Sequence, residues 1–168
     1  MHRSRKKTAI KLDMLLSTEN PAATSAFVLN SPFQSALARI RRAIRDAQLC
    51  VAAEIDAAQR VKRALQIYVS PCRVLLVDNP LFMLETTAID RASGIFVPLH
   101  LVVSGAGNRT LIYMLSPEHI RRSDLSIGVK APVLDLQRQV QRVLAAIADK
   151  PRFLHSVADT TQTAAEPG

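Results

Sequence analysis

The chain is poor in the residues that mark several common functional classes. Its 168 residues include no tryptophan, 4% are aromatic, and there are two cysteines. The scarcity of aromatic side chains argues against a platform on which single-stranded nucleic acid stacks its bases. Cys50 and Cys72 are far apart and have no CxxC spacing, so we interpret them as small buried hydrophobic residues in a reducing compartment.

Long apolar runs are also missing. The longest are of strand length, such as residues 74–77 and 99–103, whereas a membrane-spanning helix needs about 18 apolar residues. The N-terminal sequence has a basic head, but Lys11 and Asp13 interrupt the apolar segment that follows it, so it makes a poor secretory signal. We therefore expect no membrane span and a cytoplasmic location.

Positive charge is what the chain has in excess. Lys and Arg number 22 against 14 Asp and Glu, giving a net charge of +8. Such a protein is attracted to polyanions such as nucleic acid, anionic lipid or acidic partners. The length and the 48% apolar content predict one folded domain. Composition divides the chain into a basic disordered arm (1–23), a single α+β domain (24–150) and a disordered tail (151–168).

The first half of the domain alternates strands and helices. Residues 24–30 predict a strand, and Ser31 followed by Pro32 predicts the start of a helix. Residues 49–55 predict a second strand, and Asp56 an N-cap for a second helix with its apolar side facing inward. The first helix is amphipathic because its apolar residues recur at helical spacing: Phe33, Leu37, Ile40, Ile44 and Ala47.

The outer sides of these two helices are basic. If both helices cover the same face of a sheet, their cations form one surface, which makes them candidates for polyanion binding. The alternative interpretation is an ordinary solvated helix face. The candidate residues are Arg41, Arg42, Arg45, Arg60, Lys62 and Arg63.

The second half predicts a central strand, a turn, a hairpin and a long helix. Residues 73–77 form the strand, which Asn79-Pro80 ends before a short helix over residues 80–88. Two alternating apolar segments joined by residues 105–109 predict the hairpin. We expect Ile95, Val97, Leu99, Leu101 and Val103 on one face of its first strand and Leu111, Tyr113 and Leu115 on one face of its second.

An apolar stripe from Val133 to Ile147 predicts a long last helix that ends at Lys150-Pro151. The predicted fold is therefore of the α+β class, with an antiparallel sheet of about five strands covered by helices and a long C-terminal helix.

Two short motifs carry a resemblance to a known family. The order Val74-Leu75-Leu76-Val77-Asp78-Asn79-Pro80, followed by Phe96-Val97-Pro98-Leu99 and a hairpin, resembles the bacterial "domain of unknown function 302" family over about residues 24–121. The resemblance implies a fold similar to the TATA-binding-protein-like class, homodimers and no established activity. The family usually has glycine where Gln48 or Leu49 stands, and again where Asp78 stands, and both replacements remove conformational freedom at a turn.

No catalytic constellation is found. The acidic residues are scattered and no serine occupies a nucleophile elbow, so the sequence favours a non-enzymatic domain. The segment from Gly105 to Thr110 contains Gly-x-Gly but leads from strand to strand, so it predicts a hairpin loop rather than a phosphate loop.

Three functional hypotheses remain. The first is binding of a small molecule or protein partner between the sheet and the Asn79-Pro80 turn, with these candidate residues: Cys72, Asp78, Asn79, Pro80, Pro98 and His100. The second is weak nucleic-acid or other polyanion binding through the arm and the basic helix faces. The third is a cryptic Cys/His metal or redox site. Because Cys50, Cys72, His100, His119, Met83 and Met114 are not spaced like a known motif, no metal or cofactor is predicted.

Overall fold

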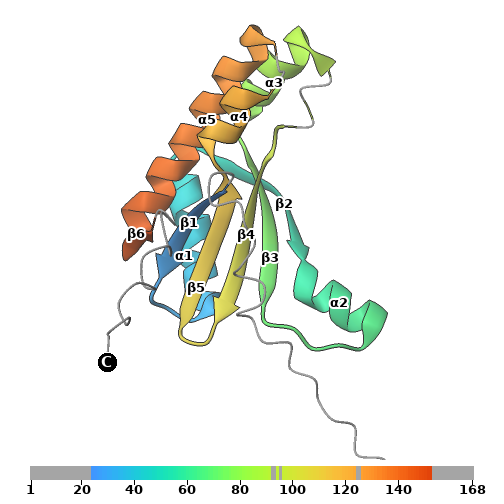
Figure 1. Cartoon of the computed structure of the whole chain (residues 1–168), viewed down its shortest axis with the longest axis vertical. Helices are drawn as coiled ribbons and strands as arrows, with labels where there is room; N and C mark the ends of the chain where they lie inside the picture. The colour runs from blue at the N-terminus through green and yellow to red at the C-terminus, as the bar shows by residue number, and fades with distance from the viewer. Residues whose placement is uncertain (1–23, 92–93, 95, 124–125, 153–168) are drawn as a thin grey trace, which may run out of the picture.

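The computed structural model describes residues 24–91, 94, 96–123 and 126–152 (Figure 1). The predicted arm, residues 153–168 of the predicted tail, and Ile95 lie outside this part of the chain. The described residues form one antiparallel sheet in the order β2-β3-β4-β5-β1-β6. Its strands are β1 (Thr24–Leu29), β2 (Cys50–Asp56), β3 (Cys72–Asp78), β4 (Leu99–Ala106), β5 (Arg109–Leu115) and the short β6 (Lys150–Arg152).

Helices cover one face of this sheet and one of its ends. Figure 1 shows α1 behind the strands and α5 running past them to meet α3 and α4 beyond the end of the sheet. The helices are α1 (Phe33–Asp46), α2 (Ala57–Leu65), α3 (Pro80–Ile89), α4 (Pro117–Arg122) and α5 (Ile127–Ile147). The predicted α+β class, with a sheet of five main strands and a long C-terminal helix, is confirmed. None of the described helices is both long and apolar enough to span a bilayer.

The core lies between the sheet and helices α1 and α5. Alternate residues of β1, β3, β4 and β5 point into it, as Leu75, Leu101 and Ile112 do, and all three are fully buried. Helix α1 contributes Leu37 and Ile40, which lie on the apolar face that the sequence predicted. Burying each of these side chains contributes about 1.5–3 kcal/mol.

The structure confirms that three β5 residues share a face and determines which face of the strand is buried. Leu111, Tyr113 and Leu115 do share a face, but it is the face away from the helices, and Leu115 remains 43% exposed. Ile112 lies opposite Phe27 of β1, and this pairing brings the other set of β5 residues under the helices. Both sets are apolar, so alternation alone could not decide which is buried.

The position of α2 differs from the prediction. Asp56 does cap the helix, since its Oδ1 accepts a hydrogen bond from Gln59 N at 2.8 Å. However, no residue of α2 is buried, and the helix stands beside the sheet rather than over it (Figure 1). Helices α1 and α2 therefore do not share one face of the sheet. The physical reason is that α2 follows directly from the end of the edge strand β2 and continues away from the core.

Two helix ends differ from the expected ones. The N-cap of α1 is Pro32, and it makes no side-chain cap bond; Ser31 Oγ is buried without a partner among the described residues. Helix α5 ends at Ile147, and the chain then forms β6 along β1. Asp149 directs this change because its backbone N–H donates to Val28 O and its side chain accepts from Asn30 N at 2.6 Å.

Candidate functional site

Most of the predicted ligand-binding residues gather at one end of the sheet. Strands β3 and β4 are antiparallel, with Val77 opposite Leu99, so the end of β3 lies beside the start of β4. Cys72 is six residues away along β3, which corresponds to about 20 Å of strand. The residues brought together are Asp78, Asn79, Pro80, Pro98 and His100.

Several of these residues have a structural explanation. Asn79 Oδ1 accepts a hydrogen bond from Leu81 N at 2.9 Å, and Pro80 occupies the first turn, so the pair begins α3. The Val97-Pro98 peptide bond is cis. His100 lies exposed on the face away from the helices, opposite Leu76.

Asp78 and Cys50 form a contact that the sequence did not predict. They face each other across β2 and β3, and the Cys50 thiol donates to Asp78 Oδ1. Asp78 is only 7% exposed. Burial, followed by the Asp78 hydrogen bond and charge, raises the pKa of Cys50 to about 11. Burial and the Asp56 charge raise the pKa of Cys72 as well. Both cysteines are therefore thiols at neutral pH and lack the low pKa of a nucleophile.

A groove of about 420 Å³ lies between α1 and the edge strand β2. Its floor is apolar and includes Ile44, Leu49 and Val51. Arg41, Arg45 and Glu54 supply its charged side chains, and Cys50 also lines it. The volume is within the range of small-molecule pockets. The sequence did not predict this groove. The candidate ligand-binding residues were chosen near the Asn79-Pro80 turn after β3, whereas the groove runs along the neighbouring strand β2.

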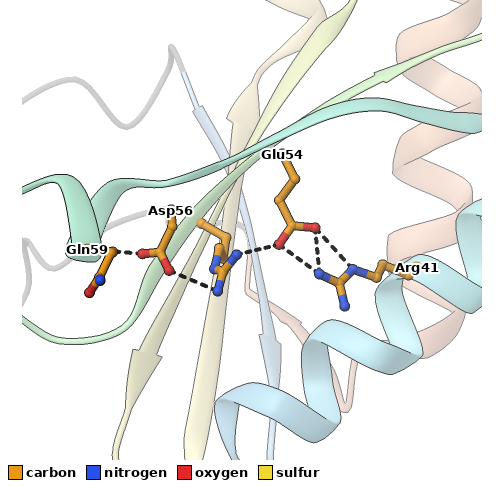
Figure 2. Close-up of polar contacts among 5 residues, drawn as sticks. Arg41, Glu54, Asp56 and Gln59 are labelled. Atoms are coloured by element: carbon orange, nitrogen blue, oxygen red, sulfur yellow. Dashed lines mark hydrogen bonds and ion pairs between the residues drawn. The ribbon is translucent and has the colours of Figure 1, made fainter.

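An ion-pair network holds one wall of the groove in place (Figure 2). Glu54 accepts from Arg41 Nη2 at 2.6 Å and from Arg73 Nη1 at 2.9 Å. Arg73 Nη2 also contacts Asp56 Oδ2 at 2.9 Å, and Asp56 caps α2 through Gln59. The network links α1, β2, β3 and α2. Because Glu54 is shared by two arginines, its charge is neutralised inside the protein.

The six predicted polyanion-binding residues fall into two separate groups. On α1, Arg41 pairs with Glu54, and Arg42 with Asp46 at 3.5 Å. On α2, Lys62 Nζ lies 4.7 Å from the Tyr68 ring centroid. No ion pair within the described residues involves the other three, which are Arg45, Arg60 and Arg63.

A second cavity is too small for a metabolite. It has about 50 Å³ of space, between Met114, Ile120 and Gln137, and so holds about one or two waters. The Gln137 side chain is fully buried; its Nε2 donates to Leu115 O, and its Oε1 has no partner among the described residues. Among these residues, no cluster of three or more His, Cys, Asp or Glu side chains is suited to a metal ion.

Comparison with known proteins decides the family. The profile described as "Domain of unknown function DUF302" matches residues 26–164. The chain belongs to the DUF302 family. No curated protein sequence matches it significantly. A crystal structure of an uncharacterized conserved DUF302 protein from Bacillus stearothermophilus superposes with a TM-score of 0.66 at 16% identity, over 73% of this chain and 96% of that chain. The similarity to that structure shows the DUF302 fold alone.

One departure from the DUF302 pattern has a visible backbone consequence. Gln48, one of the two residues at which the resemblance leads us to expect a glycine, has a φ of 59°. It follows α1 in a Schellman arrangement, in which Leu49 N donates to Ile44 O and Gln48 N to Arg45 O. Gln48 therefore adopts the left-handed conformation that glycine takes without steric cost. The predicted homodimer and the domain boundaries stay predictions.

Proposed function

We propose that this DUF302 protein binds a small anionic molecule with an apolar body in the groove between α1 and β2. The observation that carries the proposal is the position of Arg45. It lines a groove with an apolar floor, and it has no ion-pair partner within the described part of the chain. The guanidinium group offers a planar fork that matches a carboxylate or a phosphate.

Arg41 adds positive charge beside Arg45, but its own guanidinium is bonded to Glu54 rather than to the ligand. Its guanidinium makes two hydrogen bonds to Glu54 Oε2, at 2.6 and 3.1 Å, and is held in place by them. Glu54 is itself neutralised by Arg41 and Arg73. The wall therefore carries more positive than negative charge, which favours an anionic group beside an apolar floor.

A compact ligand fits this groove better than an added peptide strand. Strand β2 is at the edge of the sheet, where a partner peptide adds in many complexes. However, the register shifts between Val51 and Ala53, which marks a β-bulge. A bulge interrupts the regular row of edge N–H and C=O groups and discourages strand addition.

The chemistry beside the groove favours binding over catalysis. Cys50 is the nucleophilic side chain there, and its pKa of about 11 keeps it protonated at neutral pH. A thiol is a far weaker nucleophile than a thiolate. Asp78, its partner, already accepts the thiol proton in a hydrogen bond. We therefore propose a non-enzymatic, ligand-binding role.

Thermal-shift measurements with hexanoate, benzoate and inorganic phosphate test this role. We expect the two carboxylates with apolar bodies to raise the melting temperature more than phosphate does. Arg45→Gln should abolish the shift, because it removes the groove cation that has no ion-pair partner among the described residues. Arg42→Gln is the matched control, since Arg42 is on the same helix but is highly exposed and pairs with Asp46. Equal shifts in both variants, or no shift in the parent protein, would refute the proposal.

A further inference from the structure

Residues 57–71 leave several apolar side chains exposed to solvent. In α2, Ala57, Val61 and Leu65 recur every four residues and so lie on one side of the helix. No residue of α2 is buried. Apolar exposure continues past the helix, where Leu65 is 63% exposed and Tyr68 is 80% exposed, with Ile67 at 43% and Val69 at 45%. A contiguous exposed apolar surface of this kind marks an interaction site.

The same segment is basic. Arg60, Lys62 and Arg63 lie on α2, and residues 57–71 include no aspartate or glutamate. Arg60 and Arg63 are exposed and take no part in any ion pair with a described residue. Figure 1 shows α2 projecting beside the sheet, away from the layer formed by α1 and α5. Cations and exposed apolar side chains are therefore presented together on a protruding part of the molecule.

We propose that residues 57–71, called here the α2 tip, dock the protein onto an anionic lipid surface. The cations of α2 contact the lipid headgroups, and Leu65 and Tyr68 enter the interface between headgroups and acyl chains. This is the usual arrangement of an amphipathic basic segment that lies on a membrane without crossing it. Tyrosine suits the interface because its ring is apolar and its hydroxyl stays in contact with water.

The charge of the α2 tip argues against a second copy of the chain as its occupant. Two α2 tips facing each other would place three cations against three, with no acid in either segment. A partner protein's helix is also a poor fit. The most exposed apolar side chains occupy nearly consecutive positions, namely 65, 67, 68 and 69, rather than one helical stripe. A lipid interface accepts such an arrangement because it requires no complementary shape.

Cosedimentation of the full chain with lipid vesicles tests the proposal. One set of vesicles is phosphatidylcholine alone, and the other contains roughly one-third phosphatidylserine. We expect binding to the anionic vesicles only, weakening as salt is added. The double variant Arg60→Gln/Arg63→Gln should bind these vesicles about five-fold more weakly for each charge removed. Leu65→Ser/Tyr68→Ser should weaken binding by at least about ten-fold through lost apolar contact.

Two matched controls separate the α2 tip from the general positive charge of the protein. Arg39→Gln/Arg42→Gln removes the same charge from two exposed positions of α1. Leu81→Ser/Leu84→Ser removes two leucines from α3 that are 59% and 64% exposed. Both controls should bind anionic vesicles as the parent protein does. Circular dichroism confirms that each variant is folded.

A fluorescence measurement reports insertion directly. The chain has no tryptophan, so Tyr68→Trp introduces a single reporter whose emission should shift to shorter wavelength with anionic vesicles and stay unchanged with neutral ones. Failure of the parent protein to bind anionic vesicles would overturn the proposal, as would controls that lose as much binding as the α2 variants. A third result would also overturn it. If Leu65→Ser/Tyr68→Ser keeps full vesicle binding, while Arg60→Gln/Arg63→Gln loses binding to the vesicles and to a short DNA duplex, the segment binds any polyanion.

Discussion

The Cys50 thiol donates a hydrogen bond to the buried carboxylate of Asp78, across strands β2 and β3. The two residues are 28 positions apart in the chain, and the strand register places them opposite each other at the end of the α1–β2 groove. Asp78 stands where the family resemblance leads us to expect glycine. The carboxylate therefore has a defined role here, which is to hold a protonated thiol beside the groove.

The first prediction is that Cys50 reacts slowly with alkylating agents. Because the pKa of Cys50 is raised from 9.0 to about 11, its iodoacetamide reaction at pH 8 should be slower than that of a free thiol. Asp78→Asn removes the negative charge and should move the midpoint of the rate profile below pH 11. Mass spectrometry over a range of pH values measures this, in a Cys72→Ser background in which Cys50 is the only thiol.

The same pKa shift fixes the sign of a pH effect on stability. A group that binds its proton more tightly in the folded state stabilises that state until the proton is lost. Cys50 should therefore contribute stability below about pH 9 and lose it as the pH rises toward 11. Cys50→Ser should flatten this part of the stability profile. An unchanged slope, or alkylation of Asp78→Asn at the parental rate, would contradict the assignment.

The second prediction concerns Arg73, which bridges Glu54 and Asp56. Its side chain is 29% exposed, whereas Arg42 is 83% exposed and its partner Asp46 66% exposed. Arg73→Gln should lower the free energy of unfolding by about 1–2 kcal/mol, because two carboxylates lose a charged partner. Arg42→Gln should cost less than about 0.5 kcal/mol. Urea denaturation measures the unfolding free energy of both variants. Equal losses would mean that the ion-pair network around Arg73 stabilises the protein no more than an exposed surface pair does.

Local sequence signals predicted much of the fold because they act within a few residues. The spacing of Leu37, Ile40 and Ile44 determines the buried face of α1, and Asn79-Pro80 begins α3 through a bond to Leu81. The site depends on relations between distant segments. Neither the Cys50–Asp78 pair nor the Arg41–Glu54 wall is visible in the sequence, since each exists only through strand register and helix packing. This is why the groove was not predicted.

The third prediction tests the orientation of β5. Ile112 is fully buried under the helices, while Leu111 lies on the opposite face and is only partly covered. Ile112→Ala should cost about 2–5 kcal/mol, through lost burial and the cavity that remains. Leu111→Ala should cost about 1 kcal/mol or less. Chemical denaturation of both variants measures the difference, and a larger cost at Leu111 would reverse the assignment of the two faces.

The fourth prediction follows from the left-handed conformation of Gln48 at φ 59°. A residue with a Cβ costs about 1–2 kcal/mol in this region, and glycine is free of that cost. Gln48→Gly should therefore raise the free energy of unfolding by about 0.5–1 kcal/mol, after allowing for the greater chain entropy of glycine in the unfolded state.

Gln48→Ala is the matched control for this change, because it shortens the side chain but keeps the Cβ, and it should give no gain. Ile44 and Leu49 are both buried, and the Schellman arrangement joins them by a backbone hydrogen bond, so both variants should keep the end of α1 intact. Equal melting temperatures for the alanine and glycine variants would show that the left-handed conformation at Gln48 carries no steric cost.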